Sequence, residues 1–380
     1  MVAVRAGTQA GRRSPLRIAF VIATLDQAGA EKQLTLLATN LPRDEFEPHV
    51  LALHRGGHYE AVLREAGIPV HVIGKRRKLD LGTFRRLRAA LRAIDPDVIH
   101  SWMFTANAHV RLLHDGRRQR PWILTSERGH DDLKTRWQRW LDRRLVARTS
   151  GIVVNARALA DSARAAGFAA ERITIIPNGI EPTPPRSRLT GREPDDDFRI
   201  AFVGRLSPEK RVDVLIEAAR QLVEAGLAVK LDLMGDGPER PALEHSRARA
   251  ALGSRISFRG HQPDASSLLP AYDAFWLASD FEGTSNSLLE AMAAGLAVVV
   301  SAIPANSGVV RAGETGLLFT AGDPAALAAA TRRLIDDPKL AARLGCQAAA
   351  SIESSYVLES MIVRHAALFR SLVDGRDRRV

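Results

Sequence analysis

The sequence predicts an α/β protein made of two doubly wound domains, and three observations support this prediction. At 380 residues the chain is too long for one ordinary domain and suits two. Short β-branched runs alternate with amphipathic stretches through both halves, as in parallel sheets covered on both faces by helices. Between the halves, residues 182–197 are rich in Pro, Arg and Asp and lack apolar periodicity, which indicates an interdomain linker.

In the first predicted domain, residues 1–181, apolar runs mark the strands and apolar residues at helical spacing mark the helices. The predicted strands are Arg17–Ala23, His49–Leu53, Val70–Ile73, Val98–His100, Trp122–Thr125, Ile152–Val154 and Ile173–Ile176. Helical patterns lie between the strands, such as Glu31–Asn40, Phe84–Ile94 and Trp137–Ala147.

The second predicted domain, residues 198–353, restarts the alternation. Its strands are Arg199–Val203, Val229–Met234, Arg255–Phe258, Ala274–Leu277 and Ala297–Val300, and its helices are Val212–Glu224, Glu239–Ala250 and Ser287–Ala294. Residues 354–380 form a closing segment with a predicted helix over Tyr356–Val373. Ligands of doubly wound sheets bind beyond the carboxyl ends of the strands, so we expect the site in a cleft between the two domains.

Composition restricts the class of protein. The apolar content of 46% is ordinary for a soluble globular protein, and no apolar run reaches the roughly 18 residues of a membrane span. Ile18–Leu25 is too short for the apolar region of a signal peptide and is interpreted as a buried strand. Cys346 is the only cysteine, which excludes an internal disulfide or a thiolate metal cluster and fits a cytoplasmic setting.

The net charge of +11 is distributed unevenly. Residues 1–180 contain 30 Lys and Arg against 17 Asp and Glu, a net charge of +13, whereas residues 181–380 contain 24 against 26, a net charge of −2. The basic half indicates an anionic partner, which is a membrane surface, a nucleic acid or a phosphorylated substrate. The alternative is a set of solvated arginine faces.

The first motif with chemical potential follows the strand that ends at Gly204. A glycine lets the backbone turn sharply there, and Arg205 and Lys210 follow just before a helix. Two cations beside a helix start are suited to a pyrophosphate group. A basic solvated loop is the competing interpretation.

The second motif surrounds Glu282 and Glu290, in the loop and helix that follow Ala274–Leu277. Ser285 or Asn286 can cap that helix, and a carboxylate near a sugar can accept hydrogen bonds from its hydroxyls. The free N–H groups of the helix start face phosphate in this interpretation. The competing interpretation is a surface glutamate and a helical one stabilised by the dipole.

Together these segments resemble the family 4 retaining glycosyltransferases of the GT-B fold, whose glutamate pair separated by seven residues matches Glu282 and Glu290. The resemblance extends through Pro177–Ile180, Met234–Pro238 and Gly313–Leu318. It also includes Ala28-Gly29-Ala30-Glu31-Lys32, where the family usually has a double glycine. The match is dense over roughly residues 170–320 and thin before them.

The resemblance implies roles for these residues. Arg205 and Lys210 bind the donor pyrophosphate, Glu290 holds the ribose, and Glu282 contacts the donor sugar, so that Glu282, Arg205 and Lys210 are the expected catalytic residues. The complete expected donor-binding set is Gly29, Gly204, Arg205, Lys210, Glu282, Gly283, Asn286, Ser287, Leu289 and Glu290.

The resemblance also implies the reaction: a hexose moves from a nucleotide-diphosphate sugar with its anomeric configuration retained, and the donor is a substrate rather than a cofactor. We expect no metal requirement, because Arg205 and Lys210 supply positive charge and no cluster with ligand spacing is present. The acceptor is expected to be a sugar or a lipid-linked precursor of a surface polysaccharide. His100 and His130 are acceptor-side candidates, with structural hydrogen bonding as the alternative for either.

The stretch Thr135–Leu145 combines Trp137, Trp140, Leu141 and Leu145 on one helical face with arginines beside it. Such a helix either packs on the core or lies in the interface of an anionic membrane. The second possibility gives a cytoplasmic enzyme that is peripheral at the inner face of the membrane.

Three other functions remain as competitors. A nucleotide-sugar epimerase or a phosphorylase shares the two-domain fold. A dinucleotide-dependent dehydrogenase needs a Gly-x-Gly-x-x-Gly motif, which Ile18–Ala30 lacks. A basic protein that binds membrane or nucleic acid without catalysis fits the charge, but aromatic residues are only 5% and no nucleic-acid recognition motif is present, so no nucleic acid is expected as a partner.

Overall fold

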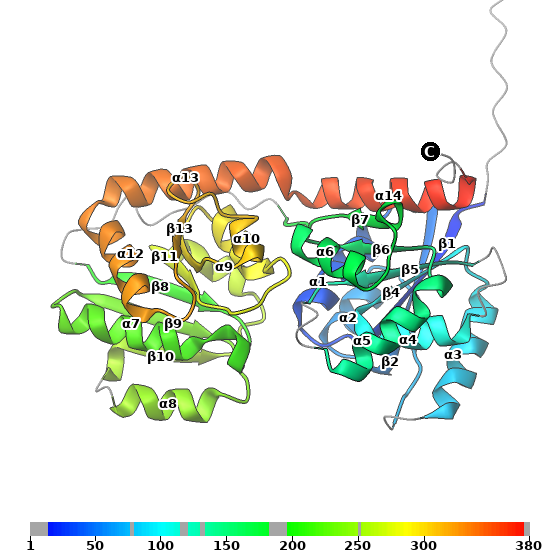
Figure 1. Ribbon diagram of the computed structural model, residues 1–380, viewed down its shortest axis with the longest axis horizontal. Coiled ribbons are helices and arrows are strands. Elements are labelled where there is room, and N and C mark those ends of the chain that lie inside the picture. Colours follow the sequence, from blue (N-terminus) through cyan, green and yellow to red (C-terminus); the bar gives the residue numbers. More distant parts are fainter. Residues whose placement is uncertain are drawn as a thin grey trace, which may run out of the picture. The chain divides into compact units, whose positions relative to one another are not determined.

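The computed structural model of the chain describes residues 14–76, 80–114, 121–129, 134–181, 196–249 and 252–375. It contains two sheets, one of seven strands and one of six, with helices between successive strands (Figure 1). The strand pairs whose register is defined are all parallel. The predicted fold class is therefore confirmed.

The first sheet has the strand order β3-β2-β1-β4-β5-β6-β7. Its strands are β1 (Leu16–Thr24), β2 (Phe46–Arg55), β3 (Val70–Val72), β4 (Val98–Trp102), β5 (Trp122–Glu127), β6 (Gly151–Val154) and β7 (Ile173–Ile175). The helices between them are α1 (Gly29–Asn40), α2 (His58–Glu65), α3 (Leu81–Ile94), α4 (Met103–Leu113), α5 (Arg136–Leu145) and α6 (Arg157–Ala165).

The second sheet has the order β10-β9-β8-β11-β12-β13. Its strands are β8 (Phe198–Val203), β9 (Val229–Met234), β10 (Ile256–Gly260), β11 (Ala274–Leu277), β12 (Ala297–Ser301) and β13 (Leu317–Phe319). The helices are α7 (Val212–Glu224), α8 (Arg240–Arg249), α9 (Ala265–Leu268), α10 (Asn286–Ala293), α11 (Pro304–Ser307), α12 (Pro324–Asp336), α13 (Pro338–Ser355) and α14 (Leu358–Asp374).

The strand order of the second sheet reverses between β8 and β11, which are direct neighbours. From this point the chain builds outward in both directions, and right-handed crossovers place α7 and α10 on opposite faces. The loops that leave the carboxyl ends of β8 and β11 therefore lie at the switch point of the sheet, where doubly wound sheets bind their ligands. Both loops carry residues of the predicted donor site.

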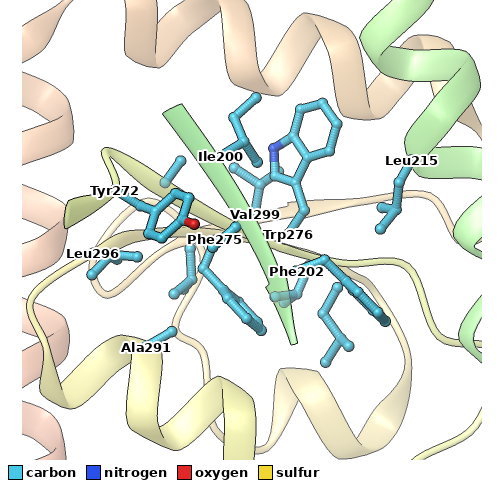
Figure 2. Close-up of a cluster of buried hydrophobic side chains, with 14 of the residues drawn as sticks. Ile200, Phe202, Leu215, Tyr272, Phe275, Trp276, Ala291, Leu296 and Val299 are labelled. Carbon is cyan, nitrogen blue, oxygen red and sulfur yellow. The ribbon is translucent and has the colours of Figure 1, made fainter. Parts of the chain in front are cut away.

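Burial on both faces of the second sheet explains why its strands read as continuous apolar runs. Phe275 and Trp276 are adjacent on β11, project to opposite sides of the strand and are both 0% exposed (Figure 2). Successive side chains of a strand alternate between faces, so only a strand covered by helices on both sides can bury both of them. The core holds β8 and β11 rigidly beneath the loops of the site.

All twelve predicted strands correspond to observed strands, and the closing helix is present as α14. One strand and several helices are not named among the elements predicted from the sequence. These are β13 and the helices α2, α4, α6, α9, α11, α12 and α13. Several of them are very short or rich in alanine, which weakens the apolar periodicity on which the prediction relied.

The described residues divide into two compact units. The first comprises the described residues within 1–125, 147–150 and 368–380, and the second comprises those within 126–146 and 151–367. The predicted boundaries at 181 and 198 adjoin residues 182–195, which lie outside the described residues, so those boundaries and the linker stay a prediction. Within the described part of the chain, no helix combines the length and the apolar character that a membrane span needs.

Candidate functional site

A partly buried ion pair lies at the carboxyl ends of β8 and β11. Lys210, at the end of the 3₁₀ turn Pro208–Lys210, pairs its Nζ with Glu282 Oε1. The Oγ of Ser279 donates to the same carboxylate oxygen at 2.8 Å. The two charged side chains are only 18% and 11% exposed, so their attraction is little screened by solvent. The structure thus brings together two residues that are 72 positions apart in the sequence.

Backbone contacts hold the two loops together beside this pair. The N–H of Asp280 donates to the carbonyl of Glu209 at 2.9 Å, and the guanidinium of Arg211 lies 3.5 Å from the Asp280 carboxylate. Arg211 adopts a left-handed φ of 48°, which turns the chain sharply from the Lys210 turn into α7. The position of Lys210 is therefore fixed by the loop around it.

Arg205 is exposed just after β8. Two glycines that follow β9 pack closely against the backbone of the loop that carries Arg205. A Cβ at Gly235, whose φ is +147°, would lie 1.9 Å from the Gly204 carbonyl oxygen. A Cβ at Gly237 would lie 2.2 Å from the Leu206 carbonyl oxygen. Only glycine permits this approach. The segment Met234–Pro238, which carries part of the family resemblance, therefore has a structural reason for both of its glycines.

The helix α10 begins beside the ion pair. The Oγ of Ser285 accepts from the Leu288 N–H at 3.4 Å as the N-cap, which confirms one of the two predicted caps. Ser287 lies in the first turn and is partly exposed, and Glu290 lies in the second. The side chain of Leu289 is 0% exposed within the core, so a ligand contact at this position would have to use the backbone. The side chain supports the helix from inside.

The loop before α10 is held by polar side chains that the sequence analysis did not select. A Cβ at Gly283 would lie 2.3 Å from the Arg128 carbonyl oxygen and 3.1 Å from Asn155 Oδ1. The amide of Asn178 donates to the Thr284 carbonyl at 3.0 Å. The sequence contains only a weak signal for Arg128, Asn155 and Asn178, because each simply follows a predicted strand of the first sheet. Asn178 also lies in Pro177–Ile180, a segment that carries part of the family resemblance.

The structure does not support His100 as an acceptor contact. His100 is 0% exposed in the middle of β4, and its ring lies 5.2 Å from the ring of Trp102 and 5.8 Å from those of Phe20 and Phe369. It is a core residue of the first unit, because β4 is flanked on both sides by other strands. His130 lies outside the described residues.

Other titratable groups gather at the carboxyl edge of the first sheet, also within the first unit. Glu31 lies in α1, the helix that begins at Gly29, a residue of the predicted donor site. Burial raises the pKa of Glu31 to about 6, and the nearby Asp26 carboxylate raises it to a lesser degree. Burial and mutual repulsion with Lys75 lower the pKa of both His54 and His109. Perturbed groups of this kind mark functional-site candidates. No periodic pattern in the sequence marks these residues.

The basic helix α5 differs from a purely core-packing helix. Trp137 is 61% exposed and Trp140 is 52% exposed, while only Asp142 and Leu145 are buried. The Arg144 guanidinium lies over the Trp140 ring at 5.4 Å. The predicted apolar face is therefore divided: its leucine end anchors the helix and its tryptophan end faces solvent.

The second unit thus offers an anion-binding arrangement at its strand switch point. The exposed cation of Arg205, the ammonium of Lys210 and the start of a helix are the kinds of group that bind phosphate. Glu282 and Glu290 flank this start of the helix with hydrogen-bond acceptors suited to hydroxyl groups. Among the described residues, no group of three His, Cys, Asp or Glu side chains is arranged to hold a metal ion.

Comparison with known proteins identifies the same family in both halves. Residues 28–183 match the family model described as Glycosyltransferase Family 4. Residues 197–337 match the model described as Glycosyl transferases group 1. The two matches meet near the segment that the sequence analysis interpreted as a linker.

The lipopolysaccharide core biosynthesis glycosyltransferase LpsD of Rhizobium meliloti is 30% identical over 339 residues, covering 84% of this chain and 92% of LpsD. The 2-deoxystreptamine glucosyltransferase of Streptomyces kanamyceticus is 28% identical over 227 residues, covering 57% of this chain and 58% of the relative. Anabaena HepE, solved in complex with UDP-glucose, is 23% identical with a TM-score of 0.81, covering 94% of this chain and 100% of HepE. The chain belongs to glycosyltransferase family 4 and is a glycosyltransferase of the GT-B fold.

Proposed function

We propose that the chain transfers a hexose from a nucleotide-diphosphate sugar, with retention of the anomeric configuration, and that the donor binds at the switch point of the second sheet. The observation that carries the proposal is the Lys210–Glu282 pair beside Arg205 and the start of α10. The bound state of HepE with UDP-glucose supports a uridine nucleotide as the first donor to test.

In this proposal the chemistry depends on charge at the leaving group. When the bond between the anomeric carbon and the diphosphate oxygen breaks, negative charge grows on the diphosphate. Lys210 and Arg205 stabilise that charge, and a preorganised cation in a poorly solvated site is more effective than one in water. Glu282 keeps Lys210 in place and accepts from a donor hydroxyl, while Glu290 accepts from the ribose. We also propose that no metal ion is required, so EDTA should leave the rate unchanged.

A thermal-shift screen of nucleotide-diphosphate sugars tests the donor site. One donor class should raise the melting temperature of the native protein, and Glu290→Ala should remove that shift by deleting the ribose acceptor. Glu353→Ala, an exposed glutamate of α13, is the matched control and should keep it. Equal shifts in all three proteins would refute the role of Glu290. Conversion of the donor at full rate without any acceptor would instead favour an epimerase.

For the acceptor we propose a lipid-linked precursor of a surface polysaccharide, met by the enzyme at the inner face of the membrane. The exposed Trp137 and Trp140 with arginines beside them suit an anionic interface, and LpsD acts in lipopolysaccharide core biosynthesis by its name. Liposome flotation tests the surface: recovery should rise with anionic lipid and fall when both tryptophans are replaced by serine. Equal recovery with neutral and anionic vesicles would refute it.

A further inference from the structure

A polar cluster inside the second unit binds the loop that leads into α10. Three side chains contribute to it, each following a strand of the first sheet: Arg128 after β5, Asn155 after β6 and Asn178 after β7. Arg128 is 8% exposed, Asn155 3% and Asn178 4%. Burial of a polar group costs free energy unless the group is hydrogen-bonded. The hydrogen bonds of these three side chains therefore determine how the side chains are oriented.

Asn178 uses the two ends of its amide for two different purposes. Its Oδ1 accepts from Arg128 Nη1 and, at 3.1 Å, from Asn155 Nδ2. Its Nδ2 donates to the Thr284 carbonyl at 3.0 Å and to Asn286 Oδ1 at 2.7 Å. The oxygen end therefore belongs to the interior of the cluster, and the nitrogen end holds the loop before α10 and the first residue of that helix.

A second anchor holds the same loop. The Thr284 hydroxyl donates to the Asn155 carbonyl at 2.9 Å, and Gly283 packs directly on the Arg128 carbonyl. Glu282, which bears the Lys210 ion pair, immediately precedes these residues. A displacement of the loop would therefore move both the carboxylate beside Lys210 and the N-terminal amides of α10.

We propose that Asn178 is a positioning residue for the donor site, which orients Glu282 and the start of α10 through its contacts with Thr284 and Asn286. This inference rests on the proposed donor site. Asn178 touches no reacting group itself; it acts through the loop. The proposal separates the stability of the cluster, which depends on the oxygen end of the amide, from donor binding, which depends on the nitrogen end.

The variant Asn178→Asp separates the two ends. The carboxylate keeps an acceptor for Arg128 and gives that buried cation a counter-charge, so the melting temperature should stay within a few degrees of wild type. The other carboxylate oxygen faces the Thr284 carbonyl and cannot donate to it. Asn286 can turn its amide so that its nitrogen donates to this oxygen, but the Thr284 carbonyl can only accept and loses its hydrogen bond. We expect kcat/KM to fall on the order of tenfold to a hundredfold, with a weaker thermal shift by uridine diphosphate.

Asn155→Ala is the matched control, because the hydrogen bond that it removes goes to the oxygen end of Asn178, while the backbone carbonyl of residue 155 still accepts from Thr284. It should lower the melting temperature while kcat/KM of the folded enzyme stays within roughly threefold of wild type. Parallel losses of stability and activity in Asn155→Ala and Asn178→Asp would overturn the proposal, and so would wild-type kcat/KM in Asn178→Asp. If Asn178→Asp does not fold, Thr284→Val removes the second anchor and must weaken the uridine diphosphate shift; an unchanged shift overturns the proposal.

Amide hydrogen exchange distinguishes this inference from the proposed function. Release of the loop in Asn178→Asp should accelerate exchange at residues 284–290, whether or not any nucleotide binds. Faster exchange in a protein whose wild type binds no nucleotide diphosphate would leave the anchoring role in place and refute the donor site. Unchanged exchange would refute the anchoring role alone.

Discussion

Substitution of Gly283 by alanine tests how closely the loop before α10 must pack. The new Cβ would lie 2.3 Å from the Arg128 carbonyl oxygen, whereas ordinary contact begins at 3.4 Å, so the loop must move by about 1 Å. Its other near neighbour, Asn155 Oδ1 at 3.1 Å, limits the direction of that movement. Overpacking of this kind costs about 1–3 kcal/mol of stability, and a 1 Å misplacement near a catalytic group costs on the order of 10²-fold in rate.

The assay is the initial rate of donor turnover in the presence of acceptor, together with the melting temperature. We expect Gly283→Ala to lower kcat/KM by roughly a hundredfold and the melting temperature by several degrees. Gly308→Ala is the matched control, since its Cβ would find its nearest atoms at 3.3 and 3.4 Å and requires only a small adjustment. A Gly283→Ala enzyme with wild-type kcat/KM would refute the reasoning, because it would show that the site tolerates a displaced loop.

Three further predictions concern stability, each measured by urea unfolding. Burial raises the pKa of Glu31 to about 6, so the folded state binds an extra proton between about pH 4.5 and 6 and loses stability as the pH rises. Glu31→Gln should raise the free energy of unfolding by up to about 2 kcal/mol at pH 7.5 and leave it unchanged at pH 4. Burial and Arg128 lower the pKa of His365 to about 3, so the free energy of unfolding should fall by up to about 1.4 kcal/mol per pH unit as the pH drops below 6.5, and His365→Leu should remove that slope. Phe369, 0% exposed against Phe20 and Phe46, should cost about 3–5 kcal/mol when replaced by alanine, whereas Val363→Ala on the exposed side of α14 should cost under about 1 kcal/mol.

The predictions made from sequence succeeded where the signal was local. The apolar runs of the second half marked five of its six strands, because a strand buried on both faces needs apolar residues at every position. The shortest one, β13, was missed because its three residues, Leu317–Phe319, are too few for a periodic signal. Helix α13 was missed for a different reason: most of its buried positions are small residues, chiefly alanine, so its apolar stripe is weak.

Interpretation of the histidines and tryptophans from sequence was less successful. A histidine at the end of an apolar strand reads equally as a site residue or as core, and only the 0% exposure of His100 separates the two. Trp137 and Trp140 share a helical face with Leu145, yet that face is buried only at the leucine end. Helical spacing predicts which residues share a face, but it does not predict how much of the face a neighbouring element covers.

The sequence by itself determined the fold class and the family, because alternating periodicity and short motifs are local properties of the chain; the donor-site residues that it points to stay a prediction. Only the tertiary structure decided that β8 and β11 are neighbours, so that Lys210 meets Glu282. It also decided that Asn178 reaches Asn286, 108 positions away. Contacts of this kind depend on strand order and on the packing of whole sheets, and no local pattern encodes which distant loops will share an edge.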